Sequence, residues 1–149
     1  MDVMSLRRGI MAAMAQGAKY VKGTFTIPLD ADATYTVNFG ETFSKYMYFV
    51  EMTDASIATL LSEPDISGDR VYAFNGIWPA PTINNNSVGD YTNCYKVKPS
   101  TGDVSAVGTA SCLTGITNSS ISFRTGVKNS GTYYFIKGYS FNCYVVEIK

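Results

Sequence analysis

Carboxylates are the side chains of this sequence best suited to chemistry, because the chain contains no histidine. Without an imidazole there is no Ser-His or Cys-His nucleophile and no histidine-ligated metal site. Two aspartate pairs, Asp30 with Asp32 and Asp65 with Asp69, could offer oxygen ligands to calcium. Neither pair carries the full alternating set of donors that a calcium loop needs. We therefore predict no metal site and no cofactor, beyond incidental weak binding.

The first of these pairs also belongs to a short motif. An alternating apolar segment, residues 25–29, is followed by Asp30, Asp32 and Thr34, and this order resembles the phosphoryl-transfer loop of haloacid-dehalogenase-type phosphatases. The resemblance implies a nucleophilic first aspartate and an acid/base second aspartate around magnesium. That fold requires a helix and a parallel sheet after the loop, whereas residues 35–39 alternate as another strand. Both aspartates are therefore expected to accept backbone hydrogen bonds in a hairpin turn, and no enzyme is predicted.

Glu51 is the one acid within a strongly apolar segment, residues 46–52. A pair of carboxylates that hydrolyses glycosidic bonds needs no histidine, but a second carboxylate facing Glu51 is not visible in the sequence. The expected explanation is an ion-pair partner such as Lys45 or Arg124, or outward orientation on a sheet edge.

Charge divides the chain into an arm and a body. Twelve basic residues balance twelve acidic ones, and this neutrality argues against a nucleic-acid partner. Residues 1–22 contain four basic residues and one acidic residue, a sum of +3, and residues 23–149 contain eight and eleven, a sum of −3. We expect an N-terminal arm over residues 1–22 and a single domain over residues 23–149.

Neither a membrane segment nor a disulfide framework is expected. No apolar run approaches the roughly 18 residues of a membrane span, so no membrane insertion is predicted. The apolar stretch of residues 10–15 is short for a signal peptide, whose apolar region is usually about 7–15 residues. The three cysteines, Cys94, Cys112 and Cys143, are best explained as free thiols in a reducing compartment.

The arm has helical periodicity. Val3, Leu6, Ile10, Ala13 and Gly17 recur at spacings of three and four, which predicts an α-helix with a narrow apolar seam. About three turns are too short to be stable alone in water. The helix must therefore pack on its own body, on symmetry mates or on a larger assembly. An N-terminal helix that covers one edge of the body's sheet is the simplest of these arrangements.

The body alternates with the period of β-strands. Thr53 or Asp54 can cap one short helix over residues 55–62, and residues 30–33 and 137–138 are expected to be hairpin turns. The fold class predicted is mainly β, an antiparallel β-sandwich or jelly-roll-like body with a short N-terminal α-helix and one short internal helix. The strands are expected at residues 24–29, 34–39, 46–52, 71–78, 92–97, 104–107, 119–124, 132–136 and 139–148, with Phe25, Ile27 and Leu29 on one face.

Aromatic residues could form a ligand-binding platform. The chain has 11 Tyr, 8 Phe and 1 Trp, and aromatic rings bind both sugar faces and protein partners. Trp78 immediately precedes a loop, residues 79–90, rich in Pro, Asn, Ser and Gly, so Trp78, Tyr72 and Asn85 are the candidate ligand-binding residues. The favoured explanation for the tyrosines in general is that they fill the β core and subunit interfaces.

Several segments resemble known proteins when they are taken in order: SLRRGIMAAMA at 5–15, KGTFTI at 22–27, NFG at 38–40, KY at 45–46 and VEMTD at 50–54. They are similar to small virion proteins of tailed phages and prophages of Gram-positive bacteria, described as tail, baseplate, fibre or minor structural proteins. FR at 123–124 followed by GTYYF at 131–135 resembles the closing strands of β-sandwich tips on phage fibres. The resemblance implies a helix that docks or trimerises, a projecting β body and repeated copies, and it identifies no active site.

The sequence therefore predicts a virion structural protein that is assembled in the bacterial cytoplasm: a homo-oligomeric, trimeric head fibre, decoration protein or tail-tip component. Its partners would be other copies of itself and other capsid or tail proteins, with the arginines facing an acidic particle surface. The alternative is a carbohydrate-binding module of a phage fibre that recognises a host cell-surface glycan. Six residues are expected to make the oligomerisation and anchoring contacts: Val3, Leu6, Arg7, Arg8, Ile10 and Ala13.

Overall fold

The described part of the chain folds into two antiparallel β-sheets and two helices. A computed structural model describes residues 3–30, 33–62, 70–79, 93–98, 101–108, 113–125 and 138–148. Its elements are α1 (Val3–Ala15), β1 (Tyr20–Thr26), β2 (Thr34–Asn38), β3 (Tyr46–Met52), α2 (Asp54–Leu61), β4 (Arg70–Trp78), β5 (Asn93–Lys98), β6 (Asp103–Gly108), β7 (Leu113–Ile116), β8 (Ser120–Arg124) and β9 (Ser140–Glu147).

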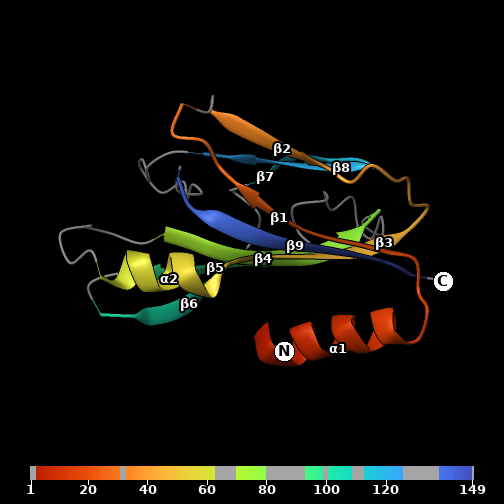
Figure 1. Ribbon diagram of the computed structural model, residues 1–149, viewed down its shortest axis with the longest axis horizontal. Helices are drawn as coiled ribbons and strands as arrows, with labels where there is room; N and C mark the ends of the chain where they lie inside the picture. Colours follow the sequence, from red (N-terminus) through yellow and green to blue (C-terminus); the bar gives the residue numbers. More distant parts are fainter. Residues whose placement is uncertain are drawn as a thin grey trace.

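The larger sheet has the strand order β1-β9-β3-β4-β5-β6, and the smaller has the order β2-β8-β7. Figure 1 shows the smaller sheet on one side of the larger sheet and α1 on the other side. All described strand pairs are antiparallel. The prediction of a mainly β, antiparallel sandwich with one N-terminal and one internal helix is confirmed.

The main core lies between the two sheets. Phe123 of β8 contacts the rings of Phe25 in β1 and Phe74 in β4, with centroid separations of 5.7 and 5.9 Å. Alternate residues of the central strands β3 and β9 point into this core, and the intervening residues face α1. Because both faces of these strands are covered, residues 46–52 have a dense apolar sequence instead of a simple alternation.

The predicted hairpin between residues 24–29 and 34–39 is wrong. β1 pairs with β9 and β2 pairs with β8, so the two consecutive strands belong to different sheets. β1 ends at Thr26, Ile27 is buried, and Leu29 is 81% exposed instead of lying on the apolar face. Alternation shows that a strand has an apolar face, but it does not identify the neighbouring strand or the residue at which the chain leaves the sheet.

The predicted internal helix and its cap are confirmed. Thr53 caps α2 by accepting a hydrogen bond from the Ser56 amide at 3.2 Å, and Leu60 anchors the helix in the core. β7 was not predicted, because its four residues include Gly115 and alternate only weakly. The predicted strand at residues 132–136 lies outside the described residues. Of the expected turn at 137–138 only Gly138 is described, and its φ is 86°.

The junction of arm and body lies earlier than the sequence suggested. α1 ends at Ala15, Gly17 adopts a φ of 87°, and the Ala18 amide donates to the Ala13 carbonyl at 3.2 Å. This geometry is a helix C-terminus closed by a left-handed glycine. β1 begins at Tyr20, so the boundary expected at residue 22 falls inside a strand that pairs with β9.

Candidate functional site

The surface covered by α1 is the candidate functional site. Ile10 is only 1% exposed and packs in a cluster with Phe49, Tyr144 and Val146, where Met47 is half-buried. The rings of Phe49 and Tyr144 stack with their centroids 6.1 Å apart. We call these four sheet residues, Met47, Phe49, Tyr144 and Val146, the helix seat. They come from β9 and β3, the second and third strands from the β1 edge, so α1 covers interior strands of the larger sheet.

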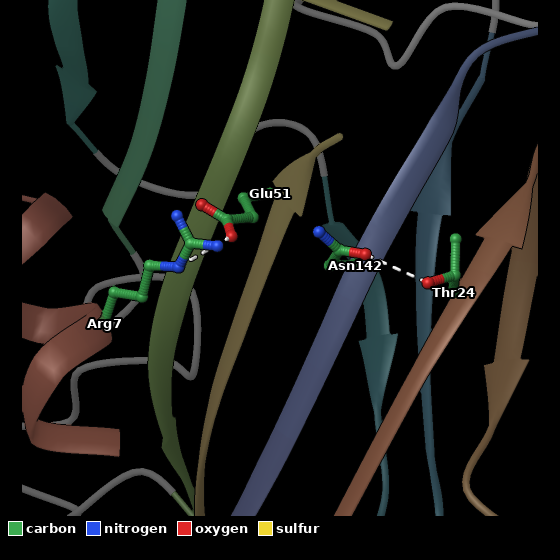
Figure 2. A network of polar contacts seen from close by, with 4 residues as sticks. All are labelled: Arg7, Thr24, Glu51 and Asn142. Carbon is green, nitrogen blue, oxygen red and sulfur yellow. Dashed lines mark hydrogen bonds and ion pairs between the residues drawn. The ribbon is translucent and has the colours of Figure 1, made fainter. Parts of the chain in front are cut away.

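A row of polar side chains borders the helix seat. Thr24, Asn142 and Glu51 lie side by side on β1, β9 and β3, as the strand register requires. Thr24 Oγ1 donates to Asn142 Oδ1 at 2.9 Å, and Arg7 reaches from α1 to place its Nε 3.4 Å from Glu51 Oε1 (Figure 2). The row therefore presents one carboxylate to the helix, and the helix supplies the matching guanidinium.

Glu51 is the unusual acid of this row. Its side chain is 12% exposed, and burial raises its pKa above the ordinary value. The positive charge of Arg7 and a hydrogen bond with Asn142 lower the pKa of this carboxyl, whereas the nearby charge of Asp54 raises it further. The desolvation effect is the largest of these, so the ion pair only partly offsets the cost of burying the charge.

The segment after α1 is fixed to the body at Lys19. Its Nζ donates to the Thr42 carbonyl at 2.6 Å, lies 3.2 Å from Glu41 Oε2 and sits 4.7 Å from the centroid of the Phe43 ring. The Glu147 amide donates to the Lys19 carbonyl at 2.9 Å. Only residues 16–18 therefore connect this fixed point to the helix.

The structure places the predicted seam on the chain's own sheet. Ile10 is buried, Ala13 is half-buried beside it, and Arg7 is half-buried at its ion pair. Arg8 is exposed on the other side of the helix. The backbone of Val3 and Leu6 belongs to α1, but their side chains lie outside the described residues. Packing on the chain's own body was one of the three expected arrangements, and α1 packs on β9 and β3, next to the edge strand β1.

The partner predicted for Glu51 is also corrected. Neither Lys45 nor Arg124 pairs with it, and Arg7 takes that place. Arg124 instead donates from Nη1 to the Leu113 carbonyl at 3.2 Å. Arg7 and Glu51 are 44 positions apart, and only the docking of α1 brings them together. The visible signal was an acid inside an apolar strand together with a basic helix that needed a place to pack.

The candidate ligand-binding aromatics do not meet. Trp78 is half-buried and stacks on Tyr46 with a centroid separation of 5.5 Å, whereas Tyr72 contacts Tyr95 at 6.4 Å. Trp78 and Tyr72 are six positions apart on one strand, which is roughly 20 Å along the chain. Asn85 lies outside the described residues. Trp78 therefore packs against the core, and these two rings form no common platform.

The edges of the two sheets enclose a groove that was not predicted from the sequence. It has a volume of about 370 Å³ and runs between β1 and β2. Gly23 leaves part of it open, since a side chain added there would meet no atom within 4 Å. Finding it requires knowledge of which strands face each other, and alternation does not provide that. The described residues that line it carry no charged group: Val21, Gly23, Thr24, Phe25, Tyr35, Thr36, Val37, Asn38, Phe39 and Cys143.

The thiols and acids of the described chain suggest no metal centre. Within the described ranges, no group of three or more Cys, Asp and Glu side chains is close enough to hold a metal ion. Cys94 and Cys143 are free and buried, as predicted for these two, and Cys112 lies outside the described residues. Burial raises the pKa of the Cys143 thiol to about 12. Asp30 is exposed in the turn after β1. Asp32, the second aspartate of the motif, lies outside the described residues.

Comparisons with known proteins give no relative: no family model, no curated protein and no solved structure matches the chain. Neither helix in the described part of the chain is long and apolar enough to cross a membrane. The geometry of the helix seat and of the surfaces around it is therefore the basis for inferring a function.

Proposed function

We propose that the protein is a structural component of a bacteriophage virion, an oligomeric appendage such as a head fibre, decoration protein or tail-tip component, anchored through α1. The observation that carries this proposal is the outer face of α1. Arg8, Met11, Ala12 and Ala15 follow the spacing of one helical face, and all four are exposed while Ile10 holds the opposite face on the sheet. We call these four residues the outer helix face.

The composition of the outer helix face suits a protein partner. Met11 is 43% exposed, and a methionine adapts its shape to the surface that it meets. The two alanines allow another backbone to approach closely, and Arg8 can bind carboxylates of an acidic particle surface in a bidentate geometry. The sequence resemblance to phage virion proteins, which includes residues 5–15, supports the same role for this helix.

A second surface supports repeated copies or neighbouring virion proteins. Val104 on the edge strand β6 is 56% exposed, and Leu61 of α2 is 43% exposed. Together with Ile57, Tyr72 and Val97 they line a shallow apolar hollow of about 100 Å³. Exposed apolar side chains beside an edge strand are typical of a surface that another protein covers.

The proposal is tested by incorporation into particles. Deletion of residues 1–22 is a poor test, because it would uncover the helix seat and remove part of β1. The double variant Arg8→Glu/Met11→Asp changes only exposed side chains. We expect it to fold normally and to be incorporated about tenfold less than the wild type, because like charges would then meet at the contact.

Lys98→Glu is the matched control, since it reverses an exposed charge at the end of β5. Incorporation is quantified by mass spectrometry of purified particles, and folding by circular dichroism. Normal incorporation of the Arg8→Glu/Met11→Asp variant would show that α1 is not the anchor.

A further inference from the structure

We propose that α1 exchanges between copies, so that the helix of one chain docks on the helix seat of the next through the same contacts that it makes in its own chain. This inference rests on the oligomeric role proposed above, and it names the interface. The occupant of the seat is thus α1 of a second copy. Four features of the described residues carry the argument: the small contact of α1, the hinge that follows it, the apolar nature of the seat and the charge at its border.

The contact between α1 and its own body is small. Among the described side chains of α1, Ile10 alone is fully buried, and Arg7, Ala13 and Met14 are half-buried. One buried isoleucine and one ion pair whose arginine remains 37% exposed are a modest gain against the entropy of ordering a three-turn helix. Detachment of α1 is therefore much easier than unfolding of the sandwich.

The hinge is confined to residues 16–18. Gly17 has a φ of 87°, and glycine is the residue that rotates most freely between the left-handed and right-handed regions. Lys19 stays attached to Glu41, to the Thr42 carbonyl and to the Glu147 amide. A change at Gly17 can therefore redirect the helix while β1 keeps its place in the sheet.

An uncovered helix seat would not remain exposed in an assembly. Without α1, the rings of Phe49 and Tyr144 and the side chain of Val146 would face water at the centre of the sheet. A contiguous apolar surface of this kind is normally buried by another protein segment. Exchange leaves no helix seat uncovered, because every seat in a closed ring of copies receives an identical helix from a neighbouring copy.

The charge at the border of the seat selects the same helix. Glu51 is 12% exposed and needs a cation, and Arg7 is placed to provide it when Ile10 enters the seat. A helix that covered the seat without a cation at this position would leave the carboxylate of Glu51 largely buried and unpaired, which is strongly unfavourable. A helix from another copy brings the isoleucine and the arginine at the correct spacing, so the seat is complementary to it in shape and in charge.

Cross-linking between differently labelled copies tests the exchange. Ala13 and Met47 are both half-buried in the cluster around Ile10, and Cys94 and Cys143 are buried. In a Cys112→Ser background, Ala13→Cys copies are mixed with Met47→Cys copies and treated with a short bismaleimide. We expect a covalent dimer that contains one chain of each kind. The mixture of Arg8→Cys with Met47→Cys should give about tenfold less, because Arg8 lies on the outer helix face.

The double variant Ala13→Cys/Met47→Cys controls for reach, since the two cysteines can link within one chain. If it links internally while the mixture of single variants gives no covalent dimer, the exchange is refuted. This experiment uses the purified protein and no particles. If the copies do not exchange helices but the Arg8→Glu/Met11→Asp variant is still incorporated poorly, only the exchange is refuted. The proposed virion role then stands.

Charge reversal gives a second, independent measurement. Arg7→Glu places two acids together in its own chain, and Glu51→Arg places two arginines together. In a mixture of the two variants, an exchanged dimer contains one reversed pair and one native pair, both attractive. Native mass spectrometry measures the amount of each oligomer. We expect about ten times more of the mixed oligomer than of the oligomer that either variant forms alone. Equal amounts in mixed and unmixed samples would contradict the proposal.

Discussion

Arg7 and Glu51 form the link between the N-terminal helix and the centre of the larger sheet. The guanidinium Nε lies 3.4 Å from the carboxylate, and the carboxylate is the more buried partner of the two. The pair lies next to Ile10, whose side chain is buried in the same interface. The position of α1 thus depends on one apolar contact and one charge pair, and each of them can be changed separately.

Replacing Glu51 by Gln should remove a pH dependence of stability. Burial raises the pKa of Glu51 in the folded chain, so the folded state holds this proton more tightly than the unfolded state does. The free energy of unfolding should therefore fall as the pH rises from the ordinary glutamate value through the raised pKa, and then level off. Glu51→Gln keeps the shape of the side chain and should lack this decrease.

Urea denaturation between pH 4 and pH 8 measures the effect, with Asp30→Asn as the control at an exposed acid. At low pH the Glu51→Gln variant and the wild type should agree, and at neutral pH the variant should be the more stable of the two. A variant that loses stability at neutral pH would show that Arg7 outweighs burial at this site.

Ile10→Ala should detach α1 without unfolding the sandwich. Truncation of a buried isoleucine costs about 2–5 kcal/mol in a rigid core, but here the loss is limited by the free energy that holds the helix on its seat. Hydrogen exchange should therefore accelerate in residues 10–18, while the amides of β3 and β9 remain protected. Met11→Ala removes a similar side chain from the outer helix face and should change stability by less than about 0.5 kcal/mol.

The prediction would be contradicted if Ile10→Ala left hydrogen exchange in α1 unchanged. It would also be contradicted if β3 lost its protection together with the helix, since the helix and the sheet would then unfold as one unit.

The fold class could be predicted from local patterns, because those patterns record burial. The apolar residues 46–52 became the central strand β3, and Thr53 became the cap of α2. Strand pairing is different. Nothing in residues 24–39 shows that β1 lies beside β9, more than one hundred positions away, because alternation has the same appearance whichever strand is the neighbour.

The site was predictable only in its components. The basic, apolar helix and the acid in an apolar strand were each visible in the sequence, but their meeting requires the docking of α1 on β3 and β9. Ile10 was assigned to the correct seam, yet periodicity does not show whether the seam faces the same chain or another one. Trp78 was a candidate ligand-binding residue, and its stacking on Tyr46 follows from their direct opposition in the register of β3 and β4.

The two described thiols should resist alkylation while the chain is folded. Burial raises the pKa of Cys143 to about 12, so almost none of it is thiolate near neutral pH, and the thiolate is the reactive form. Iodoacetamide treatment at pH 8 followed by peptide mass spectrometry should leave Cys94 and Cys143 unmodified. Both should be alkylated once urea is added. Rapid modification of Cys143 in the native protein would contradict its burial between the sheets.

Two glycine-to-alanine substitutions should change stability in opposite directions. Gly17 has a φ of 87°, where an added Cβ costs about 1–2 kcal/mol, so Gly17→Ala should lower the free energy of unfolding and disturb the end of α1. Gly23 lies within β1, and a Cβ added there would meet no atom within 4 Å. Gly23→Ala should therefore raise the free energy of unfolding by about 0.4–1 kcal/mol, because it restricts the unfolded chain. Both values come from chemical denaturation, and a loss of stability in Gly23→Ala would show that the groove between β1 and β2 is filled in solution.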